Sequence, residues 1–126
     1  MTTDVQQGVA ASQAGMLQLE LTLVTLRHLV PLAEMRPLLH EHHDYVEALE
    51  RDGHLFGSGP ILDEDGDAVG TSMWIVRADP VAAAALAAAD PLCRAGMRSV
   101  ETARWRLNMG SLNVRVKMSD GTVEVG

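Results

Sequence analysis

The sequence predicts an α+β domain with elements in the order strand, helix, strand, strand, helix, strand, followed by a hairpin. Three observations predict it. Apolar residues alternate from Met16, recur at helical spacing after Pro37, and give way to an alanine-rich stretch after Asp79. This order is typical of the ferredoxin-like arrangement, in which both helices cover one face of an antiparallel sheet. The other face must then be solvated, covered by a partner or enclose a site.

In the first half of the chain, the spacing of apolar residues changes from that of a strand to that of a helix. From Met16 the leucines alternate with other residues, which predicts a strand with one buried face running to about His28. Residues 38–52 then predict a helix, with Pro37 in its first turn and Gly53 as its left-handed stop. The apolar stripe of this helix contains Leu38, His42, Tyr45 and Leu49.

The second half is marked by turn and capping residues. Asp65-Gly66 indicates a hairpin turn, and Asp79-Pro80 indicates the start of an alanine-rich helix over 81–89 that can pack closely on a sheet. Asp90-Pro91 ends that helix, because a residue before proline avoids the helical region. The predicted strands are 54–62, 68–78 and 99–108, with a last hairpin of 113–118 and 122–125.

These boundaries divide the chain into three segments. Residues 1–15 are small and polar without a period, which predicts a flexible N-terminal arm, and they lack the regions of a signal peptide. Residues 16–110 form the predicted domain. Residues 111–126 form a C-terminal hairpin extension.

The composition narrows the classes of partner. Lys and Arg number 10 and Asp and Glu number 17, which gives a formal net charge of −7. An acidic chain lacks the basic face that a phosphate backbone or an anionic membrane surface requires, so we expect neither nucleic acid nor membrane as a partner. The single cysteine, Cys93, excludes an internal disulfide and favours a reducing, cytoplasmic location.

A histidine cluster is the first candidate for chemistry. On a helix, His40, His43 and Asp44 share a face and could hold part of a metal site, although a solvated polar face is the favoured interpretation. His42 differs because it lies in the apolar stripe. Two interpretations stay open for it: a core histidine with one hydrogen bond, or an imidazole at the edge of a pocket available for acid–base work.

An acid and a glycine-containing strand complete the candidates. Asp90 could simply cap the connector after Pro91, but in this fold it can also approach a histidine on the other helix and orient it. Ser58-Gly59 belongs to a strand whose glycines indicate a bulge or a backbone that lies close to a ligand. Apart from Arg94, Cys93 has no basic neighbourhood that would make it a catalytic thiol.

Together these segments resemble the YciI-like (YCII-related) family over roughly residues 16–107. The resemblance rests on several short motifs at characteristic intervals. They are His42-x-x-Tyr45, Leu49-x-x-x-Gly53-x-Leu55, Ser58-Gly59-Pro60, Gly70-Thr71-Ser72-Met73, Ala89-Asp90-Pro91-Leu92 and Ala95-Gly96. The chain departs from the family in having Leu39 where many members carry an arginine, which leaves an anion-binding arginine unassigned.

The resemblance implies a dimeric α/β barrel, in which the sheets of two chains face each other, and a pocket with His42 and Asp90 as catalytic residues. One branch of the family resembles a dehydrochlorinase that acts on chlorinated hydroxyhydroquinones, and relatives with the same barrel include isomerases. We therefore expect proton transfer on a cyclic or aromatic small molecule, by elimination, isomerisation or lyase chemistry, without cofactor or metal. Ser58, Gly59 and Tyr45 would contact the substrate.

We further expect a homodimer, or a higher homo-oligomer built from such pairs, and a site that is nearly apolar around one His–Asp pair. The alternative to an enzyme is a non-catalytic ligand-binding or regulatory module that keeps the same pocket.

Overall fold

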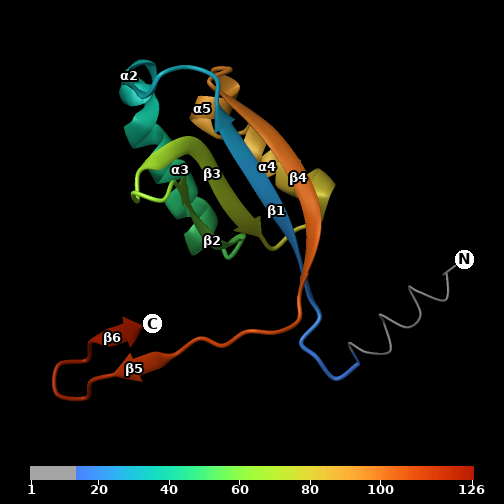
Figure 1. Ribbon diagram of the computed structural model, residues 1–126, viewed down its shortest axis with the longest axis vertical. Helices are drawn as coiled ribbons and strands as arrows, with labels where there is room; N and C mark the ends of the chain where they lie inside the picture. Colours follow the sequence, from blue (N-terminus) through green and yellow to red (C-terminus); the bar gives the residue numbers. More distant parts are fainter. Residues whose placement is uncertain (1–13) are drawn as a thin grey trace, which may run out of the picture. The chain divides into compact units, whose positions relative to one another are not determined.

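The computed structural model describes residues 14–126 and contains a four-stranded antiparallel sheet with helices on one side (Figure 1). The strands are β1 (Leu19–His28), β2 (Leu55–Leu62), β3 (Ala68–Val76) and β4 (Arg98–Leu107). Their order in the sheet is β2-β3-β1-β4, and the sheet is open rather than closed into a barrel. The ferredoxin-like order of elements is confirmed. Apart from residues 14 and 15, the expected N-terminal arm lies outside the described residues.

The helices follow the predicted positions with small shifts at their ends. They are α2 (Leu32–Met35), the 3-10 helix η1 (Arg36–Leu38), α3 (Leu39–Arg51), α4 (Pro80–Ala88) and α5 (Pro91–Arg94). Pro37 lies in η1 and not in the first turn of α3, so the helical region begins earlier than expected. Gly53 follows α3 with a φ of 81°, the left-handed conformation expected of a helix stop. Asp79 caps α4 by accepting from the backbone N–H of Ala82 at 2.8 Å.

The face of β1 that packs against the helices is not the face that carries the alternating leucines. Val24 pairs with Trp74 and Thr22 with Val76, and the buried apolar residues of these pairs pack against alanines of α4. The face toward the helices therefore carries Thr22, Val24 and Leu26, because side chains alternate along a strand. The leucines at 19, 21 and 23 take the opposite face, where Leu21 is nonetheless buried.

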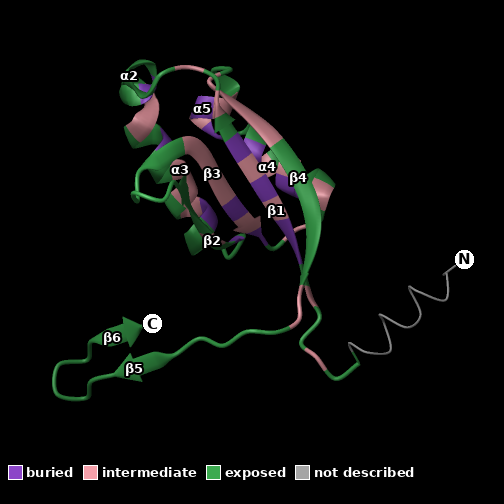
Figure 2. Cartoon of the chain, in the orientation of Figure 1, coloured by how far each residue is buried: buried purple, intermediate pink, exposed green. Residues whose placement is uncertain are grey.

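The core lies between the central strands and the helices. Figure 2 shows buried residues concentrated in β1, β3 and the helix surfaces that face them. Ala83 and Ala87 of α4 are fully buried, so the small side chains let this helix approach the sheet closely, as the sequence predicts. The partly buried residues Tyr45 and Val46 of α3 pack against the same core.

The edge strand β2 is irregular. Its pairing with β3 shifts between Leu55 and Gly57 and again between Pro60 and Leu62, which confirms the expected bulge. An edge position also tolerates Pro60, since proline offers no N–H to a ladder. The connection to β3 is the predicted turn, in which Asp63 accepts from the backbone N–H groups of Asp65 and Asp67.

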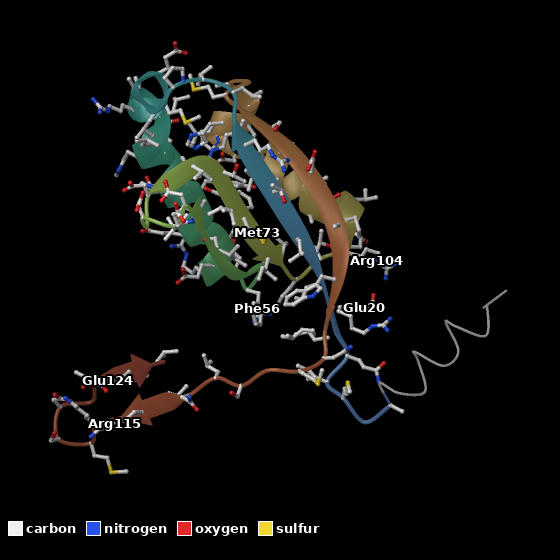
Figure 3. The ribbon with its side chains drawn as sticks, viewed as in Figure 1. Glu20, Phe56, Met73, Arg104, Arg115 and Glu124 are labelled. Atoms are coloured by element: carbon white, nitrogen blue, oxygen red, sulfur yellow. The ribbon has the colours of Figure 1, made fainter. Side chains whose placement is uncertain are left out.

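The end of the sheet where β1 begins carries ionic and aromatic contacts. Arg104 and Arg106 both donate to Glu20, and the Arg77 guanidinium lies 5.1 Å from the centre of the Phe56 ring. Figure 3 shows Glu20 and Arg104 reaching toward each other from β1 and β4. The two contacts of Glu20 tie β1 to β4 at the opposite end of β1 from His28.

The C-terminal segment forms a separate unit. By contacts within the described residues, the chain divides into Glu20–Arg106 and a smaller unit that includes Leu107–Gly126. The latter contains the predicted hairpin, β5 (Val114–Val116) and β6 (Val123–Val125), with Arg115 opposite Glu124 (Figure 3). Four exposed valines share one face of this hairpin. In the part of the chain that the structure describes, no helix is long and apolar enough to span a bilayer.

Candidate functional site

A pocket of about 250 Å³ lies between α3 and the helix-facing side of the sheet. Its lining comes from one helix and three strands that are distant in sequence. The lining residues are His42, His43, Val46, Ser58, Gly59, Pro60, Ser72, Trp74 and Arg98. This volume lies just below the roughly 300–1,000 Å³ that is common for ligand pockets, so only a compact molecule would fit.

Helix α3 positions His42 in the wall of this pocket. The helix turns the stripe that contains His42 and Leu49 toward the sheet, and both residues are buried. The imidazole of His42 lies 5.2 Å from that of His43, centre to centre, so two neighbouring histidines line the same pocket. Both interpretations of His42 agree with this geometry, because the residue is buried with a hydrogen bond to Asp90 and also lines the pocket.

Asp90 reaches His42 because of the chain's path between α4 and α5. Proline at position 91 holds Asp90 in an extended conformation, with ψ of 134°, and starts the next helical turn. The side chain makes no capping hydrogen bond to that turn, so the local capping role is wrong. Instead, Oδ1 of Asp90 lies 2.6 Å from Nδ1 of His42, and the carboxyl group is fully buried.

This contact determines how the imidazole can act. A carboxylate has only acceptor oxygens, so Nδ1 of His42 donates to Asp90. In the neutral ring the proton then resides on Nδ1, and Nε2 carries the free lone pair. A histidine held in this way can take a proton at Nε2 while the buried carboxylate stabilises the imidazolium that results.

Arg98 is a site residue that the sequence analysis missed. It lines the pocket, and its Nη2 lies 3.2 Å from Nε2 of His28 at the end of β1. Burial first, and then the positive charge of Arg98, lowers the pKa of His28, which favours the neutral ring that can accept from Arg98. The expected nearly apolar site is therefore wrong, because the half-buried Arg98 lines the same pocket as His42.

The signal for Arg98 was present in β4. Its alternation places Arg98 on the same face as Val100, which packs against the core under the helices. Starting the strand at Ser99 excluded the first residue of that face. His28 lies at the last position of β1, where strand ends are hardest to place from a sequence pattern.

Of the remaining residues expected to contact the substrate, two line the pocket and one does not. Ser58 and Gly59 line the pocket with His42. Tyr45 is not among the lining residues, and its hydroxyl donates to the carbonyl of Leu86 at 2.5 Å, which ties α3 to α4. Trp74 of β3, also not assigned to substrate contact, does line the pocket.

Cys93 lies near the pair but does not provide a nucleophile. Burial first, and then the negative charge of Asp90, raises the pKa of Cys93 to about 11. The thiol therefore stays protonated at neutral pH, and nucleophilic or metal-binding chemistry at cysteine requires the thiolate.

The other members of the histidine cluster do not assemble a metal centre. His40 pairs with Asp44 at 3.4 Å on the exposed side of α3, while His43 turns to the pocket. Within residues 14–126, no group of three or more His, Cys, Asp or Glu side chains is arranged to hold a metal ion. The solvated polar face is the better interpretation of His40 and Asp44.

One family model matches the chain. The YCII-related domain is matched over residues 21–106, more than half of the sequence and nearly the same range as the larger compact unit. No curated protein matches the chain. The matched range contains every residue that lines the pocket, together with Asp90.

Proposed function

We propose that this chain, which belongs to the YCII-related domain family, is a small-molecule enzyme that transfers a proton with a His–Asp pair. The single observation that carries the proposal is the 2.6 Å contact between His42 and the buried Asp90 in the wall of a pocket. A buried carboxylate that has no capping role, and that meets an imidazole beside a cavity, is an arrangement suited to acid–base chemistry.

In the proposed mechanism, His42 is the general base and acid and Asp90 orients it. Nε2 removes a proton from the substrate, and the imidazolium that forms is stabilised by the carboxylate of Asp90. In an isomerisation the same proton returns at another atom. In an elimination, the electron pair of the broken C–H bond forms the double bond and the leaving group departs with its own pair.

The proposed substrate is a small cyclic or aromatic molecule. The pocket volume of about 250 Å³ supports a compact substrate, and Val46, Pro60 and Trp74 offer it apolar contacts. Ser58 can donate a hydrogen bond from the pocket wall, and the backbone of Gly59 lies beside it. We propose that the reaction uses no cofactor. We also propose that the protein works in the cytoplasm, because a chain with a single cysteine needs no oxidising compartment to form an internal disulfide.

We also propose that the protein is a homodimer whose two sheets face each other. Support comes from the sheet face opposite the helices, which carries apolar side chains that neither helix covers. It includes the half-buried Leu23, Met73 and Ile75, and Trp105, which is 37% exposed. Burial of such a face against a second copy is favourable by the hydrophobic effect.

The test of the function is proton exchange in D2O. Candidate halogenated hydroquinones and lactones are incubated with the protein, and deuterium uptake and product formation are followed by NMR and mass spectrometry. We expect His42→Gln to lower the rate by about 10²–10⁴-fold, the usual contribution of a general acid–base group. His40→Gln, on the exposed side of the same helix, is the matched control and should leave the rate unchanged.

The same experiment contains the outcome that would contradict the proposal. Ligand binding without exchange or turnover in the wild type, and binding that survives His42→Ala, would favour the non-catalytic binding module instead.

A further inference from the structure

The side chain of Arg98 is half-buried, and two of its nitrogens have no partner among the described residues. Its Nε and Nη1 atoms are buried and make no hydrogen bond within residues 14–126, and its Nη2 contacts only the neutral ring of His28. None of the ion pairs formed by the described residues includes Arg98. Buried donors of a charged group normally have partners, so this arrangement favours the binding of an anion.

Asp90 does not fill that role. Its carboxylate acts on Arg98 through space, but Oδ1 contacts His42, Oδ2 makes no hydrogen bond, and none of the ion pairs within residues 14–126 joins Asp90 to Arg98. Burial lowers the pKa of Arg98, and the charge of Asp90 acts in the opposite direction. The charge of the guanidinium is therefore retained while its hydrogen-bond donors stay available.

The geometry of the guanidinium specifies the shape of the anion. An arginine presents two forks of paired N–H groups, one between Nε and Nη2 and one between Nη1 and Nη2. His28 takes a single N–H of Nη2, so whichever one it takes, the fork on the other side keeps both of its donors. Two parallel N–H groups match the two oxygens of a planar carboxylate.

The other residues that line the pocket indicate the net charge of the ligand and the nature of its uncharged part. Arg98 is the only lysine or arginine among the residues that line the pocket, so one negative charge is balanced and a phosphate dianion is not. Trp74, Val46 and Pro60 provide apolar contact for a small ring or chain. His42 lines the same pocket as Arg98.

We propose that Arg98 is a carboxylate-binding residue and that the substrate is a small monocarboxylate held by its guanidinium fork. The position of the reacting carbon beside His42 rests on the proposed function. The anion subsite itself does not, since it would bind a carboxylate whether or not a proton is transferred.

The test measures the binding of benzoate by isothermal titration calorimetry, with benzamide as the neutral molecule of the same shape and inorganic phosphate as the dianion. We expect benzoate to bind at least about ten-fold more tightly than either, because only benzoate fits the fork with one charge. Arg98→Gln should weaken benzoate binding by at least about ten-fold, and Arg98→Lys should fall between, because it keeps the charge and loses the fork.

Two control variants separate the possible causes. Arg94→Gln removes the same charge from an exposed position of α5 and should leave benzoate binding unchanged. His42→Gln should retain benzoate binding while it loses proton transfer, so that failure of the proposed function and failure of the anion subsite can be told apart. A second measurement is the Nε–H resonance of Arg98 in the wild type, which should shift on addition of benzoate and not of benzamide.

The proposal is overturned if benzoate and benzamide bind equally, if phosphate binds more tightly than benzoate, or if Arg94→Gln and Arg98→Gln weaken binding to the same degree. If Arg98→Gln does not fold, an Nε–H resonance in the wild type that is unmoved by benzoate overturns it as well.

Discussion

At the scale of single residues, Asp90 influences more than one neighbour. Its buried carboxylate holds Nδ1 of His42 and also lies near the thiol of Cys93 and the guanidinium of Arg98. Its Oδ2 is buried without a partner in the described part of the chain. The reactivity of the Cys93 thiol can therefore report the charge of Asp90 without any substrate.

The reactivity of Cys93 provides that readout. With a pKa of about 11, the thiol should be alkylated by iodoacetamide at a rate that rises about ten-fold per pH unit between about pH 8 and pH 10, without a plateau. Asp90→Asn removes the charge that disfavours the thiolate, so the pKa of Cys93 should fall and alkylation at a fixed pH should accelerate. Asp79→Asn, at the exposed cap of α4, is the control and should have no effect. Equal rates in the wild type and Asp90→Asn would mean that the carboxylate does not act on the thiol.

At the scale of elements, α4 depends on the small size of two alanines. Ala83 and Ala87 are fully buried against the sheet, so no room remains for a larger side chain. Ala87→Leu should lower the free energy of unfolding by about 1–3 kcal/mol through overpacking. Ala85→Leu, on the exposed side of the same helix, should change it by less than about 0.5 kcal/mol. Urea denaturation measures both, and equal effects would show that the close approach of α4 is not required.

The elements themselves were predictable from local sequence signals. Gly53, Asp79 and Pro91 each act within a few residues, and the helix boundaries that they set agree with the structure. The assignment of faces was less predictable. Leucines on β1 suggested the buried side, but the side that packs on the helices is decided by Thr22, Val24 and Leu26, whose partners lie about fifty residues away on β3.

The site likewise contains one feature that the sequence predicts and others that it does not. The approach of Asp90 to His42 follows from the order of elements, because both helices must cover one sheet face. Arg98 could not be assigned in this way, since its role depends on whether β4 begins one residue earlier and on which face that residue takes. Tyr45 sits one turn from His42, yet the carbonyl of Leu86 draws its hydroxyl toward α4.

At the scale of the whole molecule, the proposed homodimer depends on the sheet face that the helices leave uncovered. We expect the wild type to behave as a dimer in light scattering coupled to gel filtration. Ile75→Lys places a charge among Leu23 and Met73, so it should shift the protein toward the monomer. Val81→Lys replaces an apolar residue that is 83% exposed on α4 and should leave the dimer intact. A monomeric wild type, or a dimer unaffected by Ile75→Lys, would place the interface elsewhere or remove it.

In the proposed mechanism, Asp90 fixes the tautomer of His42 so that Nε2 can exchange a proton with a substrate. The direct measurement is the nitrogen-15 NMR spectrum of the His42 imidazole at neutral pH, recorded for the wild type and Asp90→Asn. We expect Nδ1 to carry the proton of the neutral tautomer and to give a slowly exchanging Nδ1–H resonance in the wild type, both lost in Asp90→Asn. A proton on Nε2 in the wild type, or a spectrum that Asp90→Asn leaves unchanged, would contradict it.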